Sequence, residues 1–203
     1  MTELEQTVFV VDDDPAVGDA IRLLLRSVGI PAQVFPSAME YLDAYDPERA
    51  GCLVLDVRMP GMSGLELQQR LSVMGSILPI IFVTAHGDVP MAVTAVRTGA
   101  MDFIEKPFRD QELLDKIQEA LEHDRRQRVQ QQDLTTIRER LSSLTPRERE
   151  VLELVVSGKP NKNIARSLGI SQRTVEIHRA RVMEKMNVRS VSMLVQMVMR
   201  ASS

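Results

Sequence analysis

The chain has few of the residues that mark several large classes of protein. It contains no tryptophan, two tyrosines, five phenylalanines and a single cysteine among its 203 residues. The scarcity of aromatic rings argues against a surface that stacks on unpaired bases. One cysteine cannot form an internal disulfide. Cys52 lies in an apolar run, so we expect a small buried side chain there in preference to a redox or metal-binding thiol.

Long hydrophobic runs are also missing. No apolar stretch approaches the roughly 20 residues that a membrane-spanning helix needs. The N-terminal segment carries Glu3 and Glu5 and has no apolar core of a signal peptide. Hydrophobic residues make up 44% of the chain and charged residues 26%, as in ordinary globular proteins. These features predict a cytoplasmic protein without a membrane partner.

The net charge of −3 conceals an uneven distribution of charge. Residues 1–124 contain 9 Lys and Arg against 21 Asp and Glu, whereas residues 125–203 contain 16 against 7. Only the basic part is suited to neutralise the phosphates of a nucleic acid. We therefore predict one domain at residues 1–122 and a second at 144–203. Residues 123–143 contain no proline or glycine, and we expect them to form a helical linker.

Apolar residues in and after the linker keep a 3-4-3 spacing, at Leu134, Ile137, Leu141 and Leu144. This spacing is compatible with a short seam against a partner helix. It is equally compatible with one face of the helix resting on its own domain, because the heptad does not extend back to Gln127 or Gln130. Both interpretations stay open at this point.

Short apolar runs alternate with helical patterns in the first domain. Five runs are expected to be strands: Val8–Val11, Ala32–Phe35, Cys52–Leu55, Ile80–Val83 and Phe103–Ile104. Such alternation predicts an α/β fold with a doubly wound, five-stranded parallel sheet. All the strands of a parallel sheet end at the same edge, which is where open α/β sheets place their binding sites.

Polar side chains directly follow four of these strands. They are Asp12, Asp13 and Asp14 after the first, Asp56 after the third, Thr84 after the fourth and Lys106 after the fifth. Converging carboxylates repel one another and need a cation. We expect Mg²⁺, with Mn²⁺ as an alternative. A carboxylate in this place is suited to accept a phosphoryl group, with Lys106 and Thr84 pairing to the product.

Another class of proteins has a similar carboxylate chemistry. Phosphatases of the haloacid-dehalogenase type also use an aspartate nucleophile with Mg²⁺ after a strand, in the pattern Asp-x-Asp-x-Thr/Val. In this chain Ala16 stands in the last position of that pattern. Those enzymes also normally carry a cap domain and not a basic helical tail, so the enzyme interpretation is the weaker one.

The second domain has the pattern of four helices. Thr145–Glu148 forms a capping box, Gly169-Ile170 a tight turn, and Ser171 caps a helix over about Gln172–Met186. A helix, a glycine turn, a cap and an arginine-bearing helix are typical of a helix-turn-helix. Side chains available to a major groove are Arg173, Thr174, Ile177, Ala180 and Arg181, and those suited to phosphates are Asn161, Lys162, Arg179 and Lys185.

Several alternatives accompany this assignment. Glu176 could accept a hydrogen bond from cytosine, or it could orient Arg173 or Arg179. The alternative for the whole set is a solvated basic face without a nucleic-acid ligand. A further alternative is a signalling scaffold whose C-terminal domain does not bind DNA. Another is an RNA-binding antiterminator, although the scarcity of aromatic rings argues against it.

Residues 6–122 resemble the receiver domain of two-component response regulators. The resemblance rests on Val10–Asp14, Leu55–Gly64, Val83–His86 and Glu105–Phe108. It implies a CheY-like sheet with strand order 2-1-3-4-5 and a phosphoryl group transferred from a histidine kinase to Asp56. It further implies that Asp12, Asp13, Asp56 and the main-chain carbonyl of Arg58 hold the metal, that Thr84 and Phe103 form the switch, that Lys106 contacts the phosphate, and that the Lys106–Pro107 bond is cis.

Residues 144–200 are similar to the LuxR-type helix-turn-helix. The shared strings are Leu144–Glu148, Asn161–Ala165 and Ile170–Arg179. A receiver joined to this module is the NarL/FixJ class, and His86–Val93 is similar to its FixJ branch, which includes styrene-response regulators. At the groove face, Glu176 and Ala180 replace basic residues found in some members, so the operator cannot be transferred from a relative.

The class resemblance implies a transcription regulator and not an enzyme, with at most Mg²⁺-dependent self-phosphorylation and self-dephosphorylation. Phosphorylation is expected to produce a homodimer, through a face that includes Met91, Ala95, Val96 and Phe103. The expected partners are a sensor histidine kinase, double-stranded promoter DNA and RNA polymerase, and the expected outcome is transcriptional activation.

Overall fold

The computed structural model describes residues 5–85 and 98–202 of the chain. The chain divides into two compact units, Met1–Arg128 and Val129–Ser203. None of the helices within the described ranges has an apolar stretch long enough to cross a lipid bilayer.

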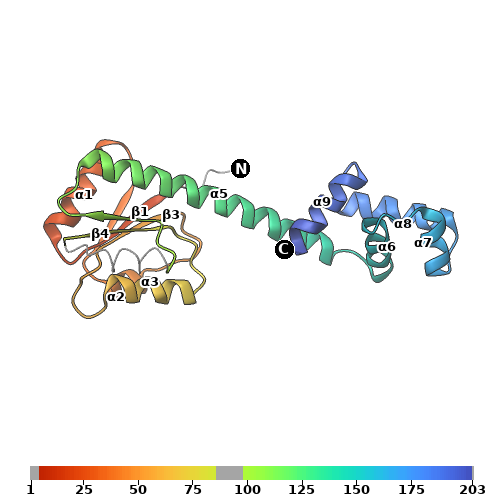
Figure 1. Ribbon diagram of the computed structural model, residues 1–203, viewed down its shortest axis with the longest axis horizontal. Helices are drawn as coiled ribbons and strands as arrows, with labels where there is room; N and C mark the ends of the chain where they lie inside the picture. Colours follow the sequence, from red (N-terminus) through yellow and green to blue (C-terminus); the bar gives the residue numbers. More distant parts are fainter. Residues whose placement is uncertain (1–4, 86–97, 203) are drawn as a thin grey trace. The chain divides into compact units, whose positions relative to one another are not determined.

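The first unit is built on a parallel sheet of five strands (Figure 1). The strands are β1 (Thr7–Val11), β2 (Ala32–Phe35), β3 (Gly51–Leu55), β4 (Ile80–Thr84) and β5 (Asp102–Glu105), and their order is β2-β1-β3-β4-β5. Every pair of neighbours is parallel. The predicted fold class and strand order are therefore confirmed, and the sequence placed each strand to within one residue at either end.

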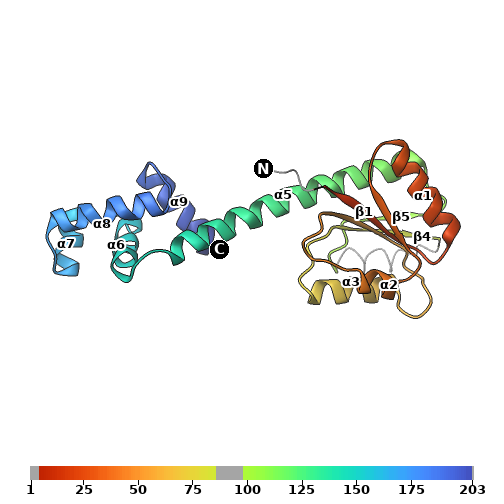
Figure 2. The same cartoon turned by 180° about the vertical axis from the view of Figure 1, so that it is seen from behind.

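Helices cover both faces of this sheet (Figures 1 and 2). On one face α2 (Ala38–Asp43) and α3 (Gly64–Val73) pack against alternate strand residues such as Phe9 and Leu53. On the other, α1 (Pro15–Ser27) and the start of α5 (Asp110–Ser142) pack against Val10, Val54 and their neighbours. The central strands β3 and β4 are buried along their whole length because both of their faces are covered.

For the helix starts in this unit, the sequence predicts Pro15 as an opening residue, a Ser37 cap on a helix over Met39–Tyr45, and a capping box from Ser63 to Glu66. Pro15 is the first residue of α1, and the Asp14 side chain accepts from the Ala16 amide at 2.9 Å. Ser37 caps α2, which spans Ala38–Asp43 and not the predicted Met39–Tyr45. Ser63 and Glu66 form the predicted capping box at α3. The helix expected from Met91 onward, with Met91, Ala95 and Val96 of the predicted dimer face, lies outside the described residues.

Helix α5 joins what the sequence suggested were two elements. The predicted last receiver helix and the predicted linker form one continuous helix, Asp110–Ser142, without a break at residue 122. Ile137, which is 6% exposed, packs with Leu144 in the core of the second unit, and Leu141 lies against that core. For these residues the apolar spacing therefore reflects packing on their own domain. The exact domain boundaries remain predictions.

The second unit is a set of helices around one apolar core. It contains α6 (Pro146–Val156), α7 (Asn161–Leu168), α8 (Gln172–Lys185) and α9 (Val191–Ser202). The Thr145–Glu148 capping box and the Ser171 cap are present as predicted. Gly169 ends α7 in the left-handed region with φ 64°. The helical class predicted for this domain is thus confirmed.

An ion pair between Glu148 and Lys185 joins the start of α6 to the end of α8 in the second unit. Glu148 is 2% exposed, and its carboxylate accepts from Lys185 Nζ at 2.6 Å and from the Thr145 amide at 2.9 Å. Lys185 also donates to the Ser143 carbonyl at 3.0 Å. The bonds from Lys185 and Thr145 lower the pKa of Glu148 to about 2.

At the start of β3, Gly51 lies too close to β1 for any side chain to fit. A Cβ atom on Gly51 would lie 1.8 Å from the Thr7 carbonyl oxygen, and the φ of Gly51 is 147°. We predict that Gly51→Ala lowers the free energy of unfolding by about 3 kcal/mol or more, because strand β1 must move away. Gly29→Ala is the control, since a Cβ there meets nothing within 4 Å and only its φ of 74° is strained. It should cost about 1 kcal/mol. Urea unfolding of the full chain measures both, and equal losses would contradict this view of Gly51.

The Glu148–Lys185 pair predicts a loss of stability with a defined pH dependence. Glu148→Gln should lower the free energy of unfolding by about 2 kcal/mol at neutral pH, because a charge-assisted bond is lost and the Lys185 ammonium loses its counter-ion. The folded-state pKa of Glu148 lies below its ordinary value of 4.5, so its stabilisation is present above pH 4.5 and disappears as the pH falls toward about 2.

Denaturant unfolding at several pH values measures this difference. Glu150→Gln, in an exposed pair with Arg147, is the matched control and should change stability little. A gap between wild type and Glu148→Gln that stays constant from pH 7 to pH 3 would refute the assignment.

Candidate functional site

The ends of four strands place four polar groups at one edge of the sheet. Strands β1 and β3 are paired up to Val11 and Leu55, so Asp12 and Asp56 leave the sheet side by side. The Asp56 amide donates to the Val11 carbonyl at 2.8 Å. Thr84 ends β4, and its carbonyl accepts from the Lys106 amide at 2.8 Å, directly after β5. Pairing between strands therefore brings together residues that are distant in the chain.

A single ammonium group lies between two carboxylates at this edge. Lys106 Nζ is 2.6 Å from Asp12 Oδ2 and 3.0 Å from Asp56 Oδ1. Asp12 and Asp56 are only 4% and 7% exposed. The positions of these three residues after parallel strands predict that they meet, and in the structure they are in direct contact.

The charges of this cluster do not balance. Burial raises the pKa of Asp12, and the nearby charge of Asp56 adds to this effect, while the bonds from Lys106 and the Asp14 amide oppose it. Burial alone would lower the pKa of Lys106, but its hydrogen bonds to Asp12 and Asp56 raise it. With Lys106 charged, two carboxylates share one positive charge, and the cluster retains an attraction for a further cation.

The remaining aspartates at the end of β1 differ in their surroundings. The Asp13 side chain is exposed at the rim of the cluster. The Asp14 side chain caps α1, and its amide donates to Asp12 Oδ1 at 3.0 Å. Asp12 therefore lies inside the cluster, Asp13 lies beside it, and Asp14 serves as the cap of α1.

The loop after β3 fixes the orientation of Asp56. The Arg58 amide donates to Asp56 Oδ2 at 2.7 Å. A Cβ atom on Gly64 would lie 2.2 Å from the Asp56 carbonyl oxygen, so only glycine allows α3 to begin this close. From the sequence alone, Gly64 has a place only in the Ser63–Glu66 cap and at the end of the receiver-like string Leu55–Gly64. Its position directly after the capping serine was the available signal, but the close contact depends on the fold.

The two residues predicted to form a switch lie on neighbouring strands. Thr84 is 1% exposed at the end of β4. Phe103 is half-buried on β5, where it is paired with Phe82 and packs against the α2–α3 side of the core. The Lys106–Pro107 bond, which follows, is cis.

The donor set of this cluster fits a magnesium ion that keeps several of its waters. Within residues 5–85 and 98–202, no three or more His, Cys, Asp or Glu side chains form a ready-made cage for a metal. Asp12 and Asp56 nevertheless offer two nearly buried carboxylates, and Asp13 adds a third carboxylate on the exposed side. Binding through one or two carboxylates and waters is the usual mode of Mg²⁺.

The second unit presents part of α8 to solvent. Arg173, Glu176, Ala180 and Arg181 are exposed, and Ile177 is 47% exposed although it is apolar. Val175 and Val182 of the same helix are buried in the core. The predicted division of this helix into a core face and an outer face is present in the structure.

Contacts along α8 show how the other predicted DNA-binding residues are held. Thr174 Oγ1 lies 2.8 Å from the hydroxyl of the capping Ser171. Arg179 Nη1 donates to Asn161 Oδ1 at 2.5 Å and so links α8 to the start of α7, where Lys162 is exposed. Lys185 is bonded to Glu148, a partner that the sequence analysis did not find because the two residues are 37 positions apart.

Comparisons with known proteins give a family match in each of the two units. Residues 8–118 match the response regulator receiver domain, and residues 142–198 match the bacterial regulatory proteins of the luxR family. Nodulation protein W of Bradyrhizobium diazoefficiens is 46% identical over 190 residues, which cover 94% of this chain and 84% of that protein. Transcriptional regulatory protein FixJ of the same organism is 44% identical over 194 residues, which cover 96% and 95%.

A solved structure extends the match to the fold. The low-resolution structure of response regulator StyR has a TM-score of 0.89 and 47% identity, and the match covers 97% of this chain and 99% of that one. The relatives are transcriptional regulatory proteins and not enzymes. This chain therefore belongs to the two-component response regulators that combine a receiver domain with a LuxR-type DNA-binding domain, and it is a transcriptional regulator.

Proposed function

We propose that Asp56 accepts a phosphoryl group from a sensor histidine kinase and that this modification switches the DNA binding of the chain. The observation that carries the proposal is the contact of one ammonium, Lys106 Nζ, with both Asp12 and Asp56. Asp56 is held by the Arg58 amide through one oxygen, and Lys106 holds the other. This arrangement fixes the carboxylate for attack on phosphorus.

Receiver domains generally bind Mg²⁺ for phosphorylation. We propose that Asp12, Asp13, Asp56 and the main-chain carbonyl of Arg58 hold Mg²⁺ in this chain, with Mn²⁺ as an alternative. When bound, the metal supplies positive charge that offsets the repulsion between the carboxylates and an incoming phosphoryl group.

The protein groups around Asp56 then have separate tasks. Lys106 neutralises part of the charge of the phosphoryl group, which is about −1.5 to −2. The Thr84 hydroxyl, at the end of the neighbouring strand, donates to a phosphoryl oxygen, and Phe103 turns inward behind it. The half-buried position of Phe103 beside Phe82 supports this motion, since the ring already lies at the edge of the core.

The output of the switch is a dimer bound to promoter DNA. We propose that the dimer face includes Phe103 together with Met91, Ala95 and Val96, which lie outside the described residues. Arg173, Thr174, Glu176, Ile177, Ala180 and Arg181 would face the major groove, and Asn161, Lys162, Arg179 and Lys185 would contact or position the phosphate backbone. Contact with RNA polymerase and activation of transcription follow from the similarity to FixJ-like regulators. With these proposed partners, the proposed location of the protein is the bacterial cytoplasm.

The proposal predicts that phosphorylation raises DNA affinity only when Asp56 is present. Duplexes selected from a random pool by the acetyl-phosphate-treated protein serve as the DNA. Acetyl phosphate with Mg²⁺ should tighten binding of the wild type by about tenfold or more, as expected when two half-sites are bound together. Asp56→Asn should bind with the unstimulated affinity whether or not the phosphodonor is added.

Asp14→Asn is the matched control for this experiment. It changes a neighbouring aspartate in the same way, and asparagine is an equally good helix cap. The control should respond like the wild type in gel-shift titrations. Equal stimulation of Asp56→Asn and Asp14→Asn would refute the proposed role of Asp56.

The outer face of α8 generates a prediction on sequence recognition. Arg173→Gln should cost about 1–3 kcal/mol on the selected duplex and much less on unrelated DNA, because a base contact is lost. Lys162→Gln should weaken binding to both DNAs alike and reduce the salt dependence by about one counterion, because a phosphate contact is lost. Arg200→Gln, on the exposed end of α9, is the control. The interface would be misplaced if Arg200→Gln weakened binding as much as Arg173→Gln.

A further inference from the structure

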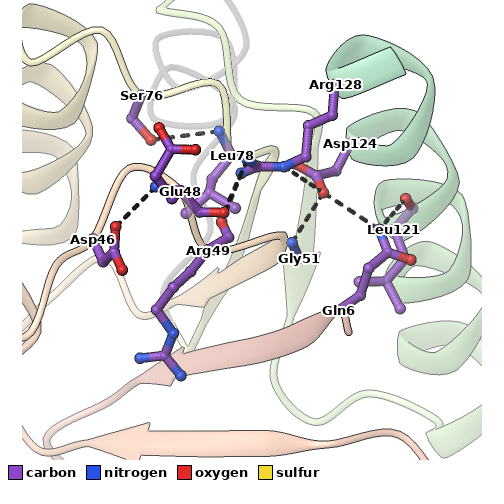
Figure 3. A network of polar contacts seen from close by, with 10 residues as sticks. All are labelled: Gln6, Asp46, Glu48, Arg49, Gly51, Ser76, Leu78, Leu121, Asp124 and Arg128. Carbon is purple, nitrogen blue, oxygen red and sulfur yellow. Dashed lines mark hydrogen bonds and ion pairs between the residues drawn. The ribbon is translucent and has the colours of Figure 1, made fainter. Parts of the chain in front are cut away.

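A second polar cluster lies at the edge of the sheet opposite to the phosphoacceptor site. We define it by Gln6, Gly51, Asp124 and Arg128 and call it the basal clamp (Figure 3). At its centre is the Asp124 carboxylate, which is 0% exposed. Asp124 Oδ2 accepts from the Gly51 amide at 3.0 Å, from Arg128 Nε at 3.1 Å and from Gln6 Nε2 at 3.3 Å.

The clamp continues onto the backbone of the first unit. Arg128 Nη2 donates to the Arg49 carbonyl at 2.6 Å, and Nη1 donates to the Glu48 carbonyl at 3.3 Å. Gln6 Nε2 also donates to the Leu121 carbonyl at 2.7 Å. Figure 3 shows these groups reaching from α5 toward the loop before β3 and the residue before β1. The stretch of α5 through Arg128 is thus bonded to the receiver at several points.

The burial of Asp124 distinguishes the clamp from the other ion pairs on this part of α5. A carboxylate without exposure is strongly destabilising unless it is paired and hydrogen-bonded, and Asp124 satisfies both conditions. Glu122, by contrast, pairs with Arg125 and Arg126, whose side chains are 61% and 70% exposed. Such exposed pairs contribute little. Arg126 is therefore a matched control for Arg128.

The strands held by the clamp are the two that carry the acidic site. Strand β1 follows Gln6 and ends before Asp12, and strand β3 begins at Gly51 and ends before Asp56. The two strands are paired along their whole length, from Thr7 and Gly51 to Val11 and Leu55. Each spans only about 17 Å, because a strand rises about 3.3 Å per residue. At one end, Gly51 of β3 and Gln6 directly before β1 donate to Asp124. At the other end, the residue directly after each strand is a carboxylate that binds Lys106.

We infer that the basal clamp couples the linker portion of α5 to the phosphorylation state of Asp56 through β1 and β3. The inference rests on the proposed function of Asp56. The clamp makes the helix through Arg128 part of the receiver, so a shift of either strand reaches the helix without passing through the predicted dimer face. Residues 129–142 of α5 then respond to phosphorylation because the helix before them is anchored.

Hydrogen–deuterium exchange on the full chain tests this coupling, with acetyl phosphate and Mg²⁺ as the phosphodonor. The proteins are wild type, Arg128→Gln, Asp124→Asn and the control Arg126→Gln. Phosphorylation should change the exchange of amides 129–142 in wild type and in Arg126→Gln. In the clamp variants, amides 124–132 should exchange roughly tenfold faster, and the change on phosphorylation should be lost. Labelling of Asp56 should stay within about twofold of wild type in every variant, since the acidic site is untouched.

The outcomes separate the clamp from the function on which it rests. If wild type is labelled but amides 129–142 do not respond, or if Arg128→Gln responds as fully as Arg126→Gln, the clamp is a static anchor and the inference is overturned. If wild type itself is not labelled, the proposed function fails and the coupling fails with it. Thermal melts identify a variant that does not fold, and Arg128→Gln decides the question if Asp124→Asn is unfolded.

Discussion

The structure depends on the unequal pairing of two carboxylates with one ammonium at the edge of a parallel sheet. Asp12 and Asp56 follow the adjacent strands β1 and β3. Lys106 follows the edge strand β5, and its ammonium group lies between the two carboxylates. Because the cluster is nearly buried, its excess negative charge is poorly screened by solvent and favours binding of a cation. The same geometry fixes one oxygen of Asp56 on Lys106 and the other on the Arg58 amide, and the proposed phosphorylation of Asp56 uses this fixed orientation.

Much of this site was predictable because its determinants are local. Apolar runs such as Ile80–Val83 mark the strands, and the parallel topology follows from their alternation with helices. Once the topology is given, residues directly after the strands must meet. The convergence of Asp12, Asp56 and Lys106 is therefore predictable from the sequence alone. The helix caps at Ser63 and Thr145 were predictable for a similar reason, since a capping box is complete within four residues.

The features that escaped prediction depend on contacts between distant parts of the chain. Asp124 stands in a segment that the sequence predicts only as a helical linker, and only the fold shows that it is buried against Gly51. From the sequence, Lys185 is suited only to contact DNA phosphates, yet in the structure it is bonded to Glu148. The continuity of α5 past residue 122 could not be derived either, because the composition of the linker is equally compatible with a separate helix.

Mass-spectrometric mapping of the phosphorylated residue tests the central claim most directly. Borohydride reduces an aspartyl phosphate to homoserine, so treating the chain with acetyl phosphate and Mg²⁺ and then with borohydride marks the modified side chain permanently. The account predicts homoserine at position 56 and unmodified aspartate at positions 12 and 13. Homoserine at another position, or a chain that remains unmodified under these conditions, would contradict it.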